Sequence, residues 1–123
     1  MKNIIILLLL LFFSCKKVDT LKDIPKPIVV TLPVTNITST TAILNGNIVS
    51  DGGVLVSSKG FYYWNKNESP KVILNLSYTN STTYYCYVDG LTPGTVYDIE
   101  AWANNDLFLI AGDTITFKTL DQK

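Results

Sequence analysis

The sequence predicts an all-β domain of the sandwich or barrel type. Apolar and polar residues alternate with a period of two in several short stretches, which is typical of strands with one buried face. These stretches are rich in Val, Ile, Thr and Tyr, and Gly, Pro, Asn and Asp separate them. No window beyond the amino-terminal segment supports a long amphipathic helix. Short strands in this number fit one seven-stranded β-sandwich.

The first two strands are expected at Ile28–Val34 and Ala42–Val49. Pro33 suits an edge strand, because proline has no N–H to give to a neighbour. The second strand alternates regularly between apolar and polar residues. It ends at Asp51-Gly52-Gly53, where glycine can adopt the positive φ of a tight turn.

The third and fourth strands are expected at Val54–Trp64 and Lys71–Leu76, with a polar loop between them. Gly60 lies in the middle of the third strand. An interior glycine of this kind predicts a bulge or a close approach of another backbone. The alternation around it places Phe61 and Tyr63 in the core.

The fifth strand, Tyr84–Val88, leads to a turn and then to the sixth strand, Val96–Asn104. Pro93 presets φ for that turn, and Gly94 can take the positive φ that follows. Tyr97 comes just after the turn. In β-sandwiches a tyrosine at this place forms a tyrosine corner, in which the hydroxyl bonds to upstream backbone.

The chain closes with a hairpin over Asn104–Gly112 and a strand over Thr114–Thr119. Cys86 alternates with core positions, so we interpret it as a small core residue rather than a reactive thiol. The sixth strand should also bury Ala101 and Ala103. The larger residues expected in the core are Leu44, Ile48, Val56, Phe61, Tyr63, Tyr84, Cys86, Val88, Leu91, Tyr97, Ile99, Ile115 and Phe117.

Five segments together resemble a fibronectin type III domain, in the variant common in bacterial surface and secreted proteins. They are Val34–Gly46, Asp51–Gly53, Gly60-Phe61, Leu91–Tyr97 and Ala101–Ala103. The resemblance covers residues 27–119 and leaves residues 120–123 as a short tail. It implies a fibronectin type III or immunoglobulin-like sandwich.

The amino-terminal segment resembles the signal peptide of a bacterial lipoprotein. Ile4–Phe13 is an unbroken apolar run after Lys2. As a helix it would span only about 15 Å, against about 30 Å for the hydrocarbon core, so a secretory signal fits better than a spanning helix. The resemblance implies cleavage after residues 1–14 and lipid, including palmitate, on Cys15. The alternative is an ordinary signal peptide with an incidental cysteine.

Residues 15–26 would then form a tether, in which Pro25 and Pro27 favour an extended spacer. Lys16 follows the cysteine in place of the aspartate that favours retention in the inner membrane of some bacteria. We therefore expect the lipid to hold the protein at the bacterial cell envelope, in the outer membrane.

The charge and residue composition argue against catalysis and nucleic-acid binding. Ten basic residues balance ten acidic ones, all the basic residues are Lys, and there is no His. The commonest general base and the best phosphate clamp are therefore missing. The Lys residues do not cluster as a nucleic-acid footprint does. We expect no enzyme activity, no cofactor and no metal site.

Aromatic residues supply the candidate binding face. If Phe61 and Tyr63 point inward, then Tyr62 and Trp64 point outward, and in this fold Trp102 lies outward on the paired strand. Exposed aromatic rings stack on sugars and anchor protein interfaces. The alternative is that these rings only stiffen the sheet. A second candidate is Phe108, at the unusually apolar tip of the last hairpin.

Three functions are compatible with these residues. The favoured hypothesis is a lipid-anchored binding or adhesion module of the cell envelope with an unknown protein partner. The second is an accessory carbohydrate-binding protein that captures glycans on the aromatic face. The third is a structural spacer or a subunit of an envelope complex.

Overall fold

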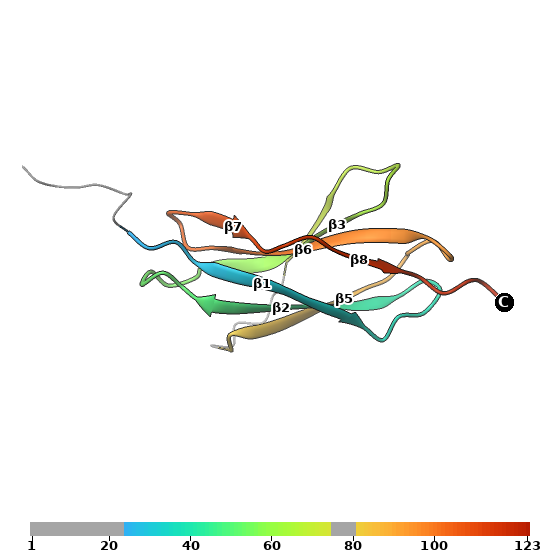
Figure 1. The fold of residues 1–123 in the computed structure, drawn as a ribbon, viewed down its shortest axis with the longest axis horizontal. Helices are drawn as coiled ribbons and strands as arrows, with labels where there is room; N and C mark the ends of the chain where they lie inside the picture. Colours follow the sequence, from blue (N-terminus) through green and yellow to red (C-terminus); the bar gives the residue numbers. More distant parts are fainter. Residues whose placement is uncertain (1–23, 75–80) are drawn as a thin grey trace, which may run out of the picture.

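A computed structural model describes residues 24–74 and 81–123 of the chain, so the predicted signal peptide, Cys15 and most of the tether lie outside the described residues. Figure 1 shows two antiparallel sheets packed face to face. Within the described residues no helix is long and apolar enough to cross a membrane. The strands are β1 (Ile28–Thr35), β2 (Ala42–Ser50), β3 (Ser58–Trp64), β4 (Lys71–Leu74), β5 (Thr83–Val88), β6 (Val96–Asn104), β7 (Leu109–Ala111) and β8 (Ile115–Lys118).

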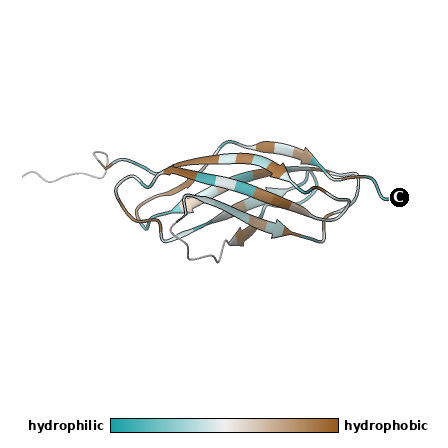
Figure 2. Cartoon of the chain, turned by 90° about the horizontal axis from the view of Figure 1, so that it is seen from below, coloured by the Kyte–Doolittle hydropathy of each residue, from teal (hydrophilic) through white to brown (hydrophobic). Residues whose placement is uncertain are grey.

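The predicted β-sandwich is confirmed. One sheet has the order β1-β2-β5, and the other has the order β4-β3-β6-β7, with β8 also paired to β6. The strands change between brown and teal along their length in Figure 2, as expected for strands with one buried face. The expected third strand begins too early, because residues 51–57 form a loop before β3. The end of the expected fourth strand lies outside the described residues.

The last hairpin differs most from the prediction, because it contains an additional strand, β7, which brings the number of strands to eight, whereas β8 lies within the predicted closing strand. Trp102 pairs with Ala111 and Ile99 pairs with Ile115, so the segment from β7 to β8 has one residue more than β6 over this interval. Such an extra residue is a β-bulge. The N–H of Gly112 donates to the carbonyl of Ala101 at 2.8 Å, which holds this segment to β6.

Strand β1 of the other sheet completes the bulge. The hydroxyl of Thr31 accepts a hydrogen bond from the N–H of Ala101 at 3.0 Å, although the two residues are far apart in sequence. A Cβ at Gly112 would lie 2.9 Å from the carbonyl oxygen of Val29. The two sheets therefore approach one another backbone to backbone at this edge, which only a glycine permits.

The predicted core is confirmed. Phe61 and Tyr84 pack with ring centroids 5.1 Å apart, and Tyr97 stacks on Phe117 at 5.7 Å. Cys86 is buried, as expected for a core residue. Every residue predicted for the core is either buried or packed against the buried cluster.

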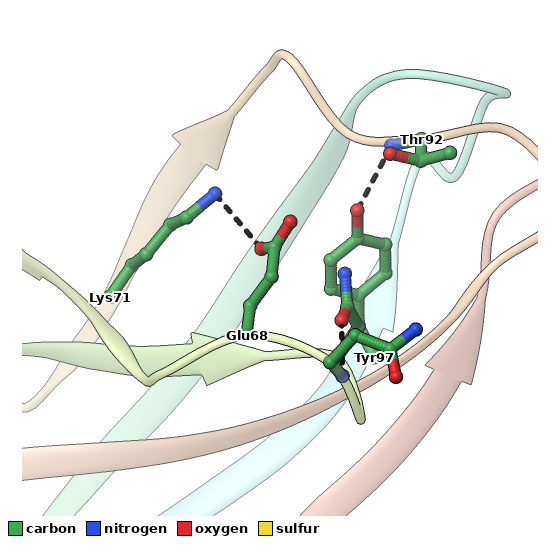
Figure 3. Close-up of polar contacts among 6 residues, drawn as sticks. Glu68, Lys71, Thr92 and Tyr97 are labelled. Atoms are coloured by element: carbon green, nitrogen blue, oxygen red, sulfur yellow. Dashed lines mark hydrogen bonds and ion pairs between the residues drawn. The ribbon is translucent and has the colours of Figure 1, made fainter.

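The turn and the tyrosine corner before β6 are also as predicted. Gly94 has a φ of 61°. The hydroxyl of Tyr97 accepts a hydrogen bond from the backbone N–H of Thr92 at 2.9 Å, a contact drawn in Figure 3. Thr119 adds a second link, because its hydroxyl donates to the carbonyl of Thr92 at 2.7 Å. The β5–β6 connection is thus fixed to the carboxyl end of the domain.

Tyr84 carries a polar group into the middle of the sandwich. Its hydroxyl donates to the carbonyl of Trp102 at 2.9 Å. The ammonium of Lys59, a buried residue, lies 5.4 Å from the Tyr84 ring and donates to the carbonyl of Ser81 at 3.3 Å. Burial raises the pKa of Tyr84 well above its ordinary value, and the neighbouring Cys86 raises it further.

The raised pKa of Tyr84 predicts a loss of stability in alkali. The folded protein holds the phenolic proton more tightly than the unfolded chain does. The resulting stability is complete below pH about 10 and is lost as the pH rises further, by up to about 1.4 kcal/mol per pH unit. Urea unfolding between pH 8 and 11 should show this loss in the wild type but not in Tyr84→Phe. Parallel pH profiles for the two proteins would contradict the assignment.

Candidate functional site

The register of β3 with β6 places the predicted aromatic residues on one outer face. Tyr62 pairs with Glu100, Gly60 with Trp102, and Trp64 with Asp98. The rings of Tyr62 and Trp102 come together, with centroids 6.0 Å apart. The structure therefore brings these three aromatic residues onto the same side of the sheet.

The expectation that Trp102 is open to solvent is wrong, because its side chain is only 5% exposed. The indole fills the space that Gly60 leaves empty, and its Cζ2 atom lies 2.9 Å from the position that a Cβ at Gly60 would occupy. A Cβ at Gly60 would also meet the backbone carbonyl oxygen of Ile73, so the predicted close approach of another backbone is confirmed. The indole Nε1 is buried and has no acceptor among the described residues. Tyr62 and Trp64 are half-buried.

The carboxylates on this face are already hydrogen-bonded to β8 and its preceding loop. The hydroxyl of Thr116 donates to Asp98 at 2.6 Å, and the hydroxyl of Thr114 donates to Glu100 at 2.6 Å. Residues 24–74 and 81–123 contain no group of three His, Cys, Asp or Glu side chains that could hold a metal ion. Because Trp102 is covered and the carboxylates of Asp98 and Glu100 already accept hydrogen bonds, this part of the sheet face is packed rather than open.

The outer face of the other sheet is more open and was not identified from the sequence. Tyr85 is 65% exposed and Tyr87 is 58% exposed. They lie two residues apart on one strand, so their side chains stand on the same face about 6.7 Å apart. Both alternate with the buried residues Tyr84, Cys86 and Val88, so the signal was present in the sequence.

We call this surface the tyrosine face. The register of β1 and β5 with β2 gives the remaining members. None of the members carries a charge. They are Val30, Leu32, Thr35, Ile43, Asn45, Asn47, Thr83, Tyr85 and Tyr87.

Two asparagines lie in the middle strand of the tyrosine face. The Nδ2 of Asn45 donates to the carbonyl of Pro33 at 2.9 Å and to the hydroxyl of Thr35 at 3.1 Å, which fixes the irregular end of β1. Asn47 is half-buried, and its Oδ1 is itself buried and has no donor in the part of the chain that the structure describes. The face therefore combines exposed phenol rings with two partly buried asparagines.

Phe108 lies apart from both sheet faces, on the loop between β6 and β7. Its half-buried ring lies 5.5 Å from the ammonium of Lys26, which belongs to the segment leading into β1. The structure therefore does not join Phe108 to Tyr62 and Trp64. The contact with Lys26 places Phe108 where the amino-terminal segment enters the domain, and Figure 1 shows the start of β7 at this same end.

Asn105 organises this loop from a fully buried position. Its Oδ1 accepts hydrogen bonds from the backbone N–H of Leu107 at 3.1 Å and of Phe108 at 2.8 Å. Its Nδ2 donates to the carbonyl of Asp51 at 3.3 Å, in the β2–β3 loop. One side chain thus holds two loops together.

Replacing Asn105 should destabilise the domain and loosen both loops. Asn105→Ala removes the partners of three backbone groups, and we expect unfolding to become easier by about 2–3 kcal/mol. Asn104→Ala is the matched control, because the side chain of half-buried Asn104 accepts one hydrogen bond within the described residues, from the N–H of Asp106 at 3.0 Å. Urea unfolding should separate the two variants clearly. Equal losses would show that Asn105 has no special role.

Comparison with solved structures supports the fold. The sensor domain of the anti-sigma factor RsgI4 in Pseudobacteroides cellulosolvens is 21% identical, with a TM-score of 0.63, over 78% of this chain and 96% of that one. A fibronectin type III domain from the human KIAA0970 protein is 13% identical, with a TM-score of 0.56, over 77% of this chain and 74% of that one.

The three-domain segment FN1–FN3 of chicken CNTN1 is also similar, with 18% identity and a TM-score of 0.62, over 79% of this chain and 32% of that one. No protein-family profile and no curated protein sequence matches the chain. At these identities the similarity defines the fold alone. The domain is an all-β sandwich of the fibronectin type III or immunoglobulin-like class.

Proposed function

We propose that the protein is a non-catalytic binding or adhesion module, anchored in the cell envelope by lipid on Cys15, which contacts its partner through the tyrosine face. The observation that carries the proposal is the uncharged, open surface of the β1-β2-β5 sheet. Exposed tyrosines are enriched at protein interfaces, whereas charged residues are depleted at interface centres. In RsgI4 a domain of similar fold serves as a sensor domain.

The tyrosine face is favoured over the predicted one for a physical reason. The rings of Tyr85 and Tyr87 are exposed, whereas Trp102 is already covered and can contribute little new burial on binding. Binding energy from apolar contact scales with the area removed from water. The side chains with most area to bury therefore lie on β5.

The binding role can be tested by co-purification from the cell envelope after mild cross-linking. Tyr85→Ser/Tyr87→Ser should lose the partner, because it removes both exposed rings and leaves the core unchanged. Val72→Ser is the matched control, since Val72 is similarly exposed, at 61%, on the other sheet. Retention of the partner by the double variant would contradict the proposal.

The anchor has its own test. Cys15→Ser should release the protein from the membrane fraction into the soluble fraction, because the acyl chains would have no site of attachment. Membrane association that persists in Cys15→Ser would contradict the lipoprotein assignment. The expected location in the outer membrane can be checked by separating the two membranes before detection.

A second candidate function is capture of an uncharged glycan on the same face. Tyrosine rings can stack on sugar rings, and the two exposed rings of Tyr85 and Tyr87 stand on one uncharged face. A glycan array probed with the folded domain should then show binding that Tyr85→Ser/Tyr87→Ser abolishes. If no glycan on the array binds and the protein partner still co-purifies with the domain, the hypothesis of a protein-binding adhesion module is favoured.

A further inference from the structure

Exposed aliphatic side chains gather at the end of the domain where the amino-terminal segment enters. Five of the eleven exposed large hydrophobic side chains in the described residues lie there, and we call them the tether-end cluster: Ile28, Val49, Leu55, Leu107 and Leu109. Leu55 is 81% exposed, the most of any of them. The loops at this end carry brown, hydrophobic segments in Figure 2.

Hydrogen bonds hold the loops of this cluster together. The backbone N–H of Ser57 donates to the carbonyl of Asn104 at 2.8 Å, which joins the β2–β3 loop to the end of β6. Ile28 pairs with Ser50, so the start of β1 lies beside the end of β2. With the Asn105 contacts, these bonds bring three chain segments to one end in a fixed arrangement.

The tether-end cluster lies beside the segment that would connect the domain to its lipid. A Cβ at Gly52 would meet the carbonyl oxygen of Pro25, so the entering segment passes directly over the β2–β3 loop. Only nine positions separate Cys15 from Ile24, a reach of at most about 30 Å. The carboxyl terminus lies at the opposite end of the sandwich (Figure 1). Lipid on Cys15 therefore keeps the tether-end cluster close to the bilayer.

The charges at this end fit a zwitterionic lipid surface. The side chain of Asp51 accepts the N–H of Gly53 at 2.8 Å, and that of Asp106 accepts the hydroxyl of Ser57 at 2.8 Å. The ammonium of Lys26 lies 5.5 Å from the ring centroid of Phe108, in the β6–β7 loop. Two acids beside one lysine give the rim around the aliphatic tip a net charge of only −1.

We propose that the tether-end cluster rests on the membrane that holds the lipid, so that the domain stands on the bilayer with the tyrosine face turned sideways. This inference rests on the proposed lipid anchor. Aliphatic side chains that insert at the headgroup boundary are removed from water, which favours binding. A short tether also holds these side chains at a high effective concentration near the bilayer, so even a weak contact is populated. The loops thus add a second membrane contact and fix the orientation of the domain.

The test uses the mature, lipidated chain in phosphatidylcholine liposomes that contain nitroxide-labelled lipid as quencher. An environment-sensitive fluorophore is attached at Leu55→Cys or, as the matched control, at Leu120→Cys. Leu120 is 57% exposed and close to the carboxyl terminus. Buried Cys86 is replaced by alanine in both. The probe at position 55 should be quenched several-fold more strongly than the probe at position 120.

A second pair of variants tests the aliphatic contact itself. With the probe at Leu109→Cys, adding Leu55→Asp/Leu107→Asp should remove most of the quenching, while the protein still floats with the liposomes. Equal or absent quenching at positions 55 and 120 in floating protein would overturn the orientation and leave the anchor intact. Protein that carries no lipid and does not float would instead refute the anchor.

Discussion

Trp102→Ala should destabilise the domain by about 3–5 kcal/mol, among the largest effects expected of a single substitution in this protein. The indole is almost fully buried although it lies on the outer side of its sheet. It contacts Gly60 from above and packs on the ring of Tyr62. Removing it would leave a cavity between β3 and β6 that these neighbours cannot fill. Urea unfolding followed by circular dichroism measures the loss.

Trp102→Phe is the matched variant, and it should cost less than about 1.5 kcal/mol. Phenylalanine keeps an aromatic ring beside Tyr62. It also removes the buried N–H, which has no acceptor in the described part of the chain, and an unpartnered buried donor is itself unfavourable by about 1–3 kcal/mol. A loss as large as that of Trp102→Ala would show that the indole N–H has a partner in solution.

Gly60→Ala should destabilise the domain by about 2–3 kcal/mol, because the new methyl group has no room. Its Cβ would meet the carbonyl oxygen of Ile73 on β4 and lie 2.9 Å from the Cζ2 atom of Trp102. The first neighbour is backbone, so β4 or the indole must move. Unfolding measurements give the loss, and a red shift of tryptophan emission should report the displaced indole.

Gly90→Ala serves as the control for glycine substitution in general. Gly90 has a φ of 70°, but a Cβ there would have open space around it. Its replacement therefore carries only the backbone strain of a left-handed conformation, about 1–2 kcal/mol. If Gly90→Ala is as damaging as Gly60→Ala and the emission of Gly60→Ala is unchanged, then the close packing of Trp102 on Gly60 is wrong.

The sequence was sufficient to predict the sandwich, because its alternation and turn residues act locally. The burial of Phe61, the tyrosine corner at Tyr97 and the turn at Gly94 all follow from short patterns. The break between β7 and β8 does not, because it depends on the approach of Thr31 from the other sheet. A contact between distant segments leaves no periodic signal.

The candidate site was harder to predict for a related reason. A period of two tells which side of a sheet Trp102 occupies, but not whether a neighbour covers it there. The glycine that makes room for the indole lies far away in sequence. Tyr85 and Tyr87 could have been assigned to an open face from the same alternation. The lack of charge on that face becomes visible only when the three strands are placed side by side.

We propose that the tyrosine face, rather than the face with Tyr62 and Trp64, contacts the partner. Site-specific photo-cross-linking in intact cells tests it most directly, with the cross-linking residue in place of Tyr87 or, as the control, Val72. Both positions are exposed, on opposite sheets. We expect an envelope adduct from position 87 and none from position 72. Adducts from position 72 without any from position 87 would contradict it.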